Sequence, residues 1–219
     1  MLRELELDLP DNPDLPPGVT ALLDEVERRS DDFYDAGLHK KIPSIIPSKP
    51  IVQFKAIQAV TDMGVVVGRN FCEWGSGFGT AALLASLLGY DAVGVEIEPI
   101  LVDFSQQLGA DLGIAADFLE TSYFPEGLDQ FTEDGGSGLV SESDDFLNFE
   151  IKTESDDDEV VDFFYEGMEL ALSEIDLFYV YPYPGDQEMF LDLFDKVAGV
   201  DAVLLTNYED GAVGAYVKI

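Results

Sequence analysis

The segment from Glu73 to Gly79 carries the residues best suited to bind a ligand, in the order Glu-Trp-Gly-Ser-Gly-Phe-Gly. The apolar residues around it predict a short buried strand over Asn70–Trp74 and a helix over Thr80–Leu88. Glycines between a strand and a helix let the backbone turn sharply and let a ligand approach without meeting a Cβ. We therefore expect a binding loop, whose candidate residues are Glu73, Gly75, Ser76, Gly77 and Gly79.

A second candidate, Glu96, ends the next expected strand, Ala92–Glu96, about twenty residues after the glycine loop. A carboxylate at the carboxyl end of this neighbouring strand can accept hydrogen bonds from both hydroxyls of a ribose. Ile97 is placed to cover a flat ring beside that ribose. Glu98 is expected to point to the opposite face, because side chains alternate along a strand.

Asp117 follows a third expected strand, Gly113–Ala116. At the end of that strand its carboxylate would accept a hydrogen bond from an adenine amino group, with Phe118 or Ile97 covering the ring. Each acid has a second interpretation in so acidic a chain, as a solvated strand end, and the glycines alone would also suit a simple turn. Three acids that end three successive strands favour a binding site over these alternatives.

Strands and helices alternate in the rest of the chain. Further helices are predicted at Pro99–Leu108, Val160–Leu172 and Gln187–Ala198, and further strands at Ile175–Val180, Ala202–Leu205 and Ala212–Val217. This rhythm predicts an α/β protein with a parallel sheet and right-handed crossovers. The carboxyl ends of the strands, and the candidate residues with them, should then share one edge of the sheet.

We expect two parts in the chain: an N-terminal arm with helices, residues 1–66, packed on a ligand-binding domain, residues 67–219. The first sixteen residues are rich in Asp and Pro and predict an irregular arm or a strand on the surface. Amphipathic helices are expected from Pro17 to about Phe33 and from Pro50 to Met63.

The charge of the chain is strongly negative: 45 Asp and Glu face 11 Lys and Arg, for a formal net charge of −34. Many of the acids fall in an expected surface insertion at about 126–159. A field of this sign repels a phosphate backbone and disfavours nucleic acid as a partner, whereas cationic partners are electrostatically easier. The acids also fit a solubility coat or an adaptation to a salty habitat.

The composition also limits which disulfides, metal sites and cellular compartments fit the chain. A single cysteine, Cys72, excludes an internal disulfide, and with a single histidine, His39, the chain predicts no Cys- or His-based metal site. The N-terminus lacks an uninterrupted signal-peptide core, and no apolar stretch approaches the length of a membrane span. We expect a cytoplasmic protein without a membrane partner, and the oligomeric state stays open.

From about Pro47 to the C-terminus these features resemble the class I, seven-strand methyltransferases. The resemblance implies a three-layer α/β/α sandwich on a Rossmann-like, mostly parallel sheet of about six to seven strands with an antiparallel C-terminal strand. It also implies the cofactor S-adenosyl-L-methionine, with the Glu73 loop around its methionine part, Glu96 on the ribose and Asp117 on the adenine. A dinucleotide site would favour Gly-x-Gly-x-x-Gly, but Thr80 takes the place of the last glycine.

A narrower similarity, to small lysine methyltransferases of the type that modify the ATP synthase c subunit, rests on Ile46–Pro50, Val93–Pro99 and Tyr179–Pro182. It implies a protein lysine as acceptor. Methyltransferases of planar nitrogens often end the fourth strand with Asn or Asp and Pro-Pro, and Tyr-Pro-Tyr-Pro stands there instead, which disfavours base or glutamine methylation. Tyr181 and Tyr183 are the candidate catalytic residues, although aromatic residues beside prolines also commonly serve packing.

Three functions fit the sequence. The first is a methyltransferase that acts on a small molecule or a protein side chain. The second is a protein that binds an adenosyl ligand without turnover, and the third is an acidic interaction module on the same fold. Fold analogy alone does not choose among them.

Overall fold

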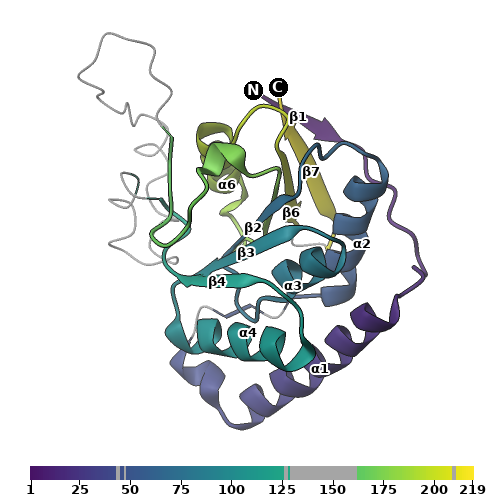
Figure 1. The fold of residues 1–219 in the computed structure, drawn as a ribbon, viewed down its shortest axis with the longest axis vertical. Helices are drawn as coiled ribbons and strands as arrows, with labels where there is room; N and C mark the ends of the chain where they lie inside the picture. The colour runs from purple at the N-terminus through teal and green to yellow at the C-terminus, as the bar shows by residue number, and fades with distance from the viewer. Residues whose placement is uncertain (43–44, 47, 126–127, 129–161, 209–210) are drawn as a thin grey trace.

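The computed structural model describes residues 1–42, 45–46, 48–125, 128, 162–208 and 211–219 (Figure 1). The acidic insertion expected at about 126–159 lies outside the described residues, apart from Leu128. Among the described residues, no helix combines the length and the apolar character that crossing a lipid bilayer requires.

A seven-stranded sheet in the order β1-β7-β6-β5-β2-β3-β4 forms the centre of the molecule. Its strands are β1 (Leu2–Leu5), β2 (Asn70–Trp74), β3 (Asp91–Glu96), β4 (Asp117–Glu120), β5 (Leu177–Val180), β6 (Val203–Asn207) and β7 (Val213–Lys218). The five strands from β6 to β4 run parallel, and β7 runs antiparallel to β6. This confirms the mostly parallel, Rossmann-like sheet with an antiparallel C-terminal strand.

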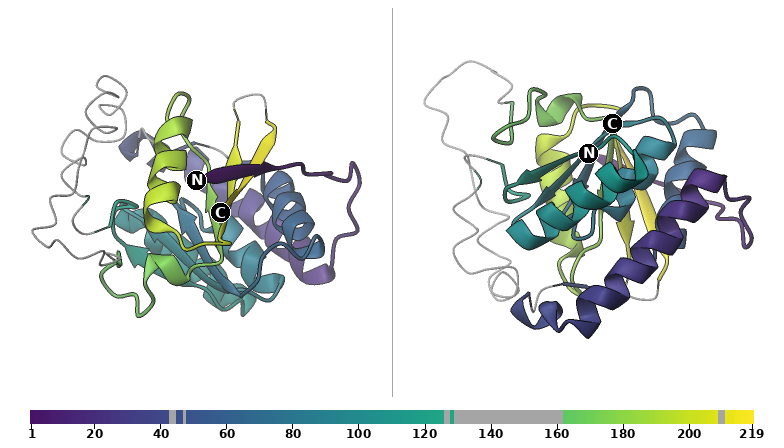
Figure 2. Two further views of the ribbon diagram at one scale, coloured as in Figure 1. Left: turned by 90° about the horizontal axis from the view of Figure 1, so that it is seen from above. Right: turned by 60° about the horizontal axis from the view of Figure 1, so that its bottom comes forward.

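Helices cover both faces of the sheet, which makes the three layers of the predicted sandwich (Figure 2). One face carries α1 (Pro17–Asp35), α2 (Pro50–Asp62), α3 (Thr80–Leu87) and α4 (Pro99–Leu112), and the other carries α6 (Gln187–Val197). Prolines occupy the first turn of α1, α2 and α4, where the missing N–H breaks no helical hydrogen bond. The helices expected from sequence at these places are confirmed.

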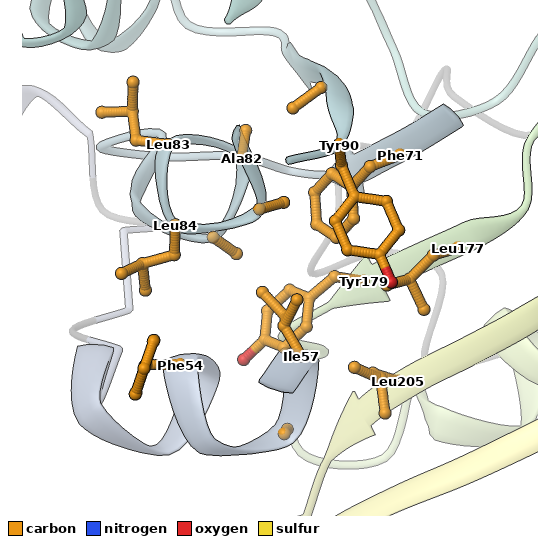
Figure 3. Packing of buried hydrophobic residues seen from close by; sticks show 14 of the residues in the cluster. Phe54, Ile57, Phe71, Ala82, Leu83, Leu84, Tyr90, Leu177, Tyr179 and Leu205 are labelled. Atoms are coloured by element: carbon orange, nitrogen blue, oxygen red, sulfur yellow. The ribbon is translucent and has the colours of Figure 1, made fainter. Parts of the chain in front are cut away.

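Alternate residues of each central strand enter two separate cores. Phe71 of β2 and Tyr179 of β5 pack against the helices of the first face, whereas Cys72 and Phe178 pack on the side of α6. Figure 3 shows the first core, where side chains of α2 and α3 meet residues of β2, β5 and β6. Burial on both faces explains why these strands read as continuous apolar runs in the sequence.

The N-terminal residues supply the edge strand beyond β7. Leu2–Leu5 pairs antiparallel with β7, and the Ile219 N–H donates to the Met1 carbonyl oxygen (3.0 Å), so the two termini lie side by side (Figure 1). Of the two expectations for this segment, a surface strand holds for residues 2–5 and an irregular arm for residues 6–16. The sheet thus reaches seven strands although only one strand follows β6.

Two expected elements are wrong. The strand expected at Gly113–Ala116 is absent, because α4 continues to Leu112, Gly113 ends it with a φ of 66°, and the Ile114 N–H donates back to the Gly109 carbonyl oxygen (2.9 Å). Ile114 packs on the core as part of this helix end, and the strand begins only at Asp117. The apolar character of this stretch therefore reflects the packing of a helix terminus.

The helix expected at Val160–Leu172 is wrong for its described part, residues 162–172, which hold only the start of a 3₁₀ turn, Leu172–Glu174. Phe163 and Tyr165 are buried on either side of Phe164, which is 47% exposed, so burial alternates as in an extended chain. Gly167, with a φ of 88°, then turns the chain away from helical geometry. Residues 160–161 lie outside the described residues.

Candidate functional site

A cavity of about 200 Å³ opens at the carboxyl ends of β2, β3 and β5. The chain leaves β2 toward β3 and β4 and later returns to β5 on the other side of β2, so the cavity lies where the strand order reverses. Ligands of open α/β sheets bind at such a reversal. The N-terminal part of the chain contributes to the cavity wall through Ile42, Ile45, Ile46, Ser48 and Gln53.

The glycine loop borders the cavity and is shaped by its glycines. Gly77 has a φ of 54°, a conformation that residues with a Cβ rarely adopt, and a Cβ there would meet no atom within 4 Å. Gly75, Ser76 and Gly77 line the cavity, whereas Gly79 does not. A Cβ on Gly79 would lie 2.5 Å from a ring carbon of Phe118, so this glycine serves close packing under the loop.

Glu96 ends β3, is buried and lines the cavity, as the sequence predicts. Its Oε2 accepts a hydrogen bond from the Gly77 N–H (2.8 Å), and its Oε1 accepts from the N–H groups of Ile97 (2.9 Å) and Glu98 (3.0 Å). Burial raises the pKa of Glu96, and these three hydrogen bonds oppose the shift. The carboxylate thus ties the glycine loop to the end of β3 and keeps one lone pair of Oε2 for a ligand.

Glu73 lies at the end of β2, 4% exposed, and also lines the cavity. Its Oε2 accepts a hydrogen bond from the Ala82 N–H (2.8 Å), so the side chain binds the first turn of α3. Burial raises the pKa of Glu73 to about 8, hydrogen bonds from Ala82 and Ala81 oppose this shift, and repulsion from Glu96 adds to it. A cation in the cavity would favour the ionised form of this carboxyl.

Ile97 and Glu98 both line the cavity beside Glu96. Ile97 is 63% exposed, an unusual position for a large apolar side chain and one that suits contact with a flat ligand ring. The expectation that Glu98 points to the opposite face is wrong. The strand ends at Glu96 and α4 begins at Pro99, so alternation along a strand no longer governs residue 98.

Asp117 lies away from the cavity, and its placement at the end of a strand is wrong. It begins β4 and pairs in register with Val93, three residues before Glu96, which puts it roughly 10 Å from the carboxyl edge. Phe118 packs below the glycine loop against Gly79 and Gly94 and does not line the cavity. Residues 121–124, which follow β4, take the place in the cavity wall that the sequence assigned to Asp117 and Phe118.

Tyr181 and Tyr183, the candidate catalytic residues, both line the cavity just beyond the end of β5. Tyr123 and Phe190 line it nearby, with ring centroids 5.1 Å apart. Burial raises the pKa of Tyr123 to about 12, and repulsion from Asp186 contributes to that shift. One end of the cavity is therefore aromatic, whereas the glycine loop forms the other.

Besides the indole N–H of Trp74, two polar atoms in the cavity wall have no hydrogen-bond partner among the described residues: Ser76 Oγ and Gln53 Oε1. Both residues are buried, with exposures of 5% and 2%. Buried polar groups are almost always paired, so such atoms indicate partners that a ligand would supply. Sequence reasoning missed Gln53, although an amide among the apolar residues of α2 was the signal that could have found it.

The cavity wall is acidic. Glu73, Glu96 and Glu98 line it, and no Lys, Arg or His stands among its described lining residues. The described residues hold no group of three or more His, Cys, Asp or Glu side chains placed to bind a metal ion. The arrangement suits a ligand that brings positive charge and hydrogen-bond donors.

No family model matches the chain, and no curated protein does. Among solved structures, it is similar to an RNA methyltransferase from Salinibacter ruber in complex with S-adenosyl-L-homocysteine, at 15% identity, over 80% of this chain and 94% of that one, with a TM-score of 0.49. A hypothetical protein of Thermus thermophilus matches at 13% identity, over 80% and 90% of the two chains, with a TM-score of 0.49.

A third similar structure is a precorrin-6y C5,15-methyltransferase from Geobacter metallireducens, at 16% identity, over 70% of this chain and 62% of that one, with a TM-score of 0.40.

Proposed function

We propose that this chain is an S-adenosyl-L-methionine-dependent methyltransferase whose acceptor is a small molecule or a protein side chain. The observation that carries the proposal is the acidic, glycine-lined cavity at the carboxyl ends of β2 and β3, with Glu73 and Glu96 buried in its wall. Its glycine loop leaves open space at Gly77 and contributes Ser76, whose Oγ has no hydrogen-bond partner among the described residues, to the cavity wall.

The charge of the cavity wall favours S-adenosyl-L-methionine over the dinucleotides that similar folds bind. A pyrophosphate group would meet the carboxyl groups of Glu73, Glu96 and Glu98, of which burial leaves Glu73 largely protonated at pH 7, and no cationic side chain among the described lining residues. Each like-charge contact of this kind costs about 1 kcal/mol at 4 Å in water and more in a partly buried site. A sulfonium and an ammonium group on the ligand would instead be attracted, which favours the methyl donor over NAD.

The chain's own residues supply complementary places for the donor. Glu96 has a lone pair available for a ribose hydroxyl, Ile97 offers an apolar surface to the adenine, and Ser76 Oγ and Gln53 Oε1 can pair with donor N–H or O–H groups. In place of Asp117, we assign the edge of the adenine to residues 121–123. When bound, the donor supplies a methyl group on a sulfonium, which a nucleophile takes while the carbon–sulfur electron pair stays on sulfur.

Tyr181 and Tyr183 are proposed to stand on the acceptor side, where the end of β5 meets the cavity. Methyl transfer from a sulfonium depends mainly on holding the nucleophile and the methyl group in line, which walls of rigid aromatic rings can do. The same features fit the protein-lysine acceptor that the sequence similarity implies. They also fit a small amine.

Calorimetry with S-adenosylmethionine and S-adenosylhomocysteine tests the proposal, with NAD as the control ligand. We expect both adenosyl ligands to bind and NAD not to bind. Absence of binding by both would leave the acidic interaction module as the function. Binding without uptake of labelled methyl by either the protein or the small-molecule fraction of a lysate would favour the non-catalytic alternative.

A further inference from the structure

Asp186 is a buried carboxyl group outside the residues that hold the donor. It is 5% exposed and occupies the N-cap position of α6, yet its side chain makes no capping hydrogen bond. Its Oδ2 has no hydrogen-bond partner among the described residues. An Asp at this position normally accepts from the free N–H groups of the first helical turn. This side chain therefore gives up its usual partner and has gained none within the described part of the chain.

The surroundings of Asp186 place it behind the aromatic end of the cavity. Its N–H donates to the Tyr183 carbonyl oxygen (3.0 Å), and its charge contributes to the raised pKa of Tyr123. Both tyrosines line the cavity, as does Phe190, one turn further along α6. Asp186 does not line the cavity itself, but it lies near three aromatic residues that do, Tyr123, Tyr183 and Phe190.

An acid with this placement is costly unless something compensates it. A buried carboxyl group without partners favours its neutral form, and burial raises the pKa of Asp186. An ammonium group that enters between the rings would provide both the missing hydrogen-bond donors and the opposite charge. Aromatic faces add to the attraction because their electron-rich surfaces bind cations.

We propose that Asp186, with Tyr123, Tyr183 and Phe190 around it, forms the acceptor subsite, and that the methyl acceptor is an alkyl amine. The inference rests on the proposed methyltransferase function and narrows its acceptor to one chemical class. The amine enters as an ammonium ion and binds Asp186. One N–H proton then passes to the carboxylate, which becomes a neutral carboxyl group, and the nitrogen keeps the electron pair that it needs as a nucleophile.

The subsite disfavours the other common acceptors. A carboxylate or a phosphate would place a second negative charge beside Asp186, and a hydroxyl would bring one donor and no charge. Asp186 thus acts as a selector of charge as well as a proton acceptor. Its position on α6 and the loop before it, rather than on β2 or β3, separates this role from the binding of the donor.

The test uses the full chain with saturating S-adenosylhomocysteine and three probes of similar size: n-butylammonium, n-butanol and n-butyrate. Binding is followed by NMR titration of the probes. We expect only n-butylammonium to bind, and Asp186→Asn to weaken it at least tenfold while the affinity for S-adenosylhomocysteine stays within twofold. Glu188→Gln removes the same charge from the exposed first turn of the same helix and should change neither affinity.

The outcomes separate the two proposals. If S-adenosylhomocysteine fails to bind the wild-type chain, the proposed function falls and the acceptor inference falls with it. If S-adenosylhomocysteine binds but n-butyrate binds as well as n-butylammonium, or Asp186→Asn keeps the amine affinity, only the acceptor inference is overturned. A tenfold loss of S-adenosylhomocysteine affinity in Asp186→Asn would also overturn it, by assigning Asp186 to the donor.

Folding of the variant is checked by its thermal midpoint. Because a neutral amide costs less to bury than an unpaired carboxylate, Asp186→Asn should unfold at the same temperature as the wild type or higher. Two amine sources are then compared with labelled donor: a lysine-containing tripeptide and putrescine. Label on the tripeptide alone assigns a protein lysine, label on putrescine alone assigns a small amine, and label on neither overturns the inference.

Discussion

Two buried carboxylates at the carboxyl edge of the sheet differ in how the chain satisfies them. Glu96 receives three backbone hydrogen bonds, from Gly77, Ile97 and Glu98, whereas Asp186 Oδ2 receives none from the described residues. The first carboxylate is part of the architecture of its loop. The carboxyl group of Asp186 is buried by the surrounding chain, and its Oδ2 has no hydrogen-bond partner among the described residues. The glycine-loop half of the cavity is therefore preorganised by the backbone, and the aromatic half depends on what enters it.

The same difference appears in the elements that carry the two halves. The glycine-loop half stands on β2, α3, β3 and α4, which form one continuous strand-helix repeat with a close-packed core. The aromatic half stands on residues 121–125 after β4 and 181–186 after β5, which hold no helix or strand, and on α6. Substitutions in the first half should therefore affect folding and donor binding together. Substitutions in the second should affect ligand selection with little change in folding.

Among the substitutions in the glycine-loop half, Gly79→Ala should lower the free energy of unfolding most. The new Cβ would lie 2.5 Å from the Phe118 ring and 2.7 Å from Ser105 Cβ, at a φ of 71°. We expect a loss of about 3 kcal/mol or more in the free energy of unfolding, from the clash and the backbone strain together. The matched control is Gly64→Ala, at a φ of 64° with no atom within 4 Å of the Cβ, where strain alone should cost about 1 kcal/mol. Equal losses in urea titrations would contradict close packing at the loop.

Glu96→Ala should weaken donor binding at least tenfold, the scale for loss of one charged hydrogen-bond partner. It should also lower the free energy of unfolding by about 2 kcal/mol, because three backbone N–H groups lose their acceptor. Calorimetry with S-adenosylhomocysteine and urea unfolding measure the two effects. Glu120→Ala is the control, since Glu120 pairs in register with Glu96 at the end of β4 but is exposed and outside the cavity wall. Unchanged affinity in Glu96→Ala would falsify the ribose assignment.

Glu73 should make donor binding depend on pH. Its pKa of about 8 means that the carboxyl group is largely protonated at pH 7, and a cationic donor favours the ionised form. We expect the affinity for S-adenosylmethionine to rise up to about tenfold from pH 7 to pH 9. In Glu73→Gln the affinity for S-adenosylmethionine should change with pH only through the titration of the ligand's own amino group. A wild-type curve that matches the Glu73→Gln curve would show that Glu73 keeps its charge.

Stability should respond to pH in the opposite sense. The folded chain holds an extra proton on Glu73 between its ordinary pKa of 4.5 and about 8, so rising pH destabilises the wild type across this window. Glu73→Gln removes the effect. The difference in thermal midpoint between the two proteins should therefore change steadily from pH 5 to pH 8 and level off above it.

Of these variants, Ser76→Ala should have the smallest effects on the free energy of unfolding and on donor affinity. Because Ser76 Oγ has no partner among the described residues, its removal should leave the free energy of unfolding within about 0.5 kcal/mol of the wild type. Donor affinity should fall about threefold to fivefold if the hydroxyl binds the donor. Ser105→Ala provides the contrast, because Ser105 Oγ donates to the carbonyl oxygens of Gly77 and Leu101 and its loss should destabilise the loop. A destabilised Ser76→Ala would show that the Ser76 hydroxyl has a hydrogen-bond partner within the protein.

Local signals were enough to place the glycine-loop half of the cavity. The apolar runs before and after the glycine loop fixed β2 and α3, and the strand before Glu96 was equally clear, so both acids were found at the correct edge. Asp117 was misplaced because the edge strand β4 buries little and reads as polar, while the apolar residues before it belong to the end of α4. A shift of four residues was enough to move that acid to the other end of its strand.

The aromatic half could not be predicted in the same way. Tyr181 and Tyr183 were placed correctly because they directly follow a strand, but Asp186 looks in sequence like an ordinary helix cap before α6. Only the folded arrangement shows that its side chain leaves the helix uncapped. Gln53 is a similar case, since its role depends on how α2 packs over strands that come later in the chain. The surroundings of Asp186 and Gln53 depend on contacts between segments far apart in the chain, which the spacing of apolar residues in the sequence does not predict.

The pairing of β1 with β7 has a consequence for how the chain is made. Leu2–Leu5 is synthesised more than two hundred residues before its partner strand, residues 213–218. Until β7 has been made, this edge strand has no native partner, and β7 in turn stays open on one side until Leu2–Leu5 pairs with it. Closure of this edge of the sheet should thus be among the last folding events of residues 1–219.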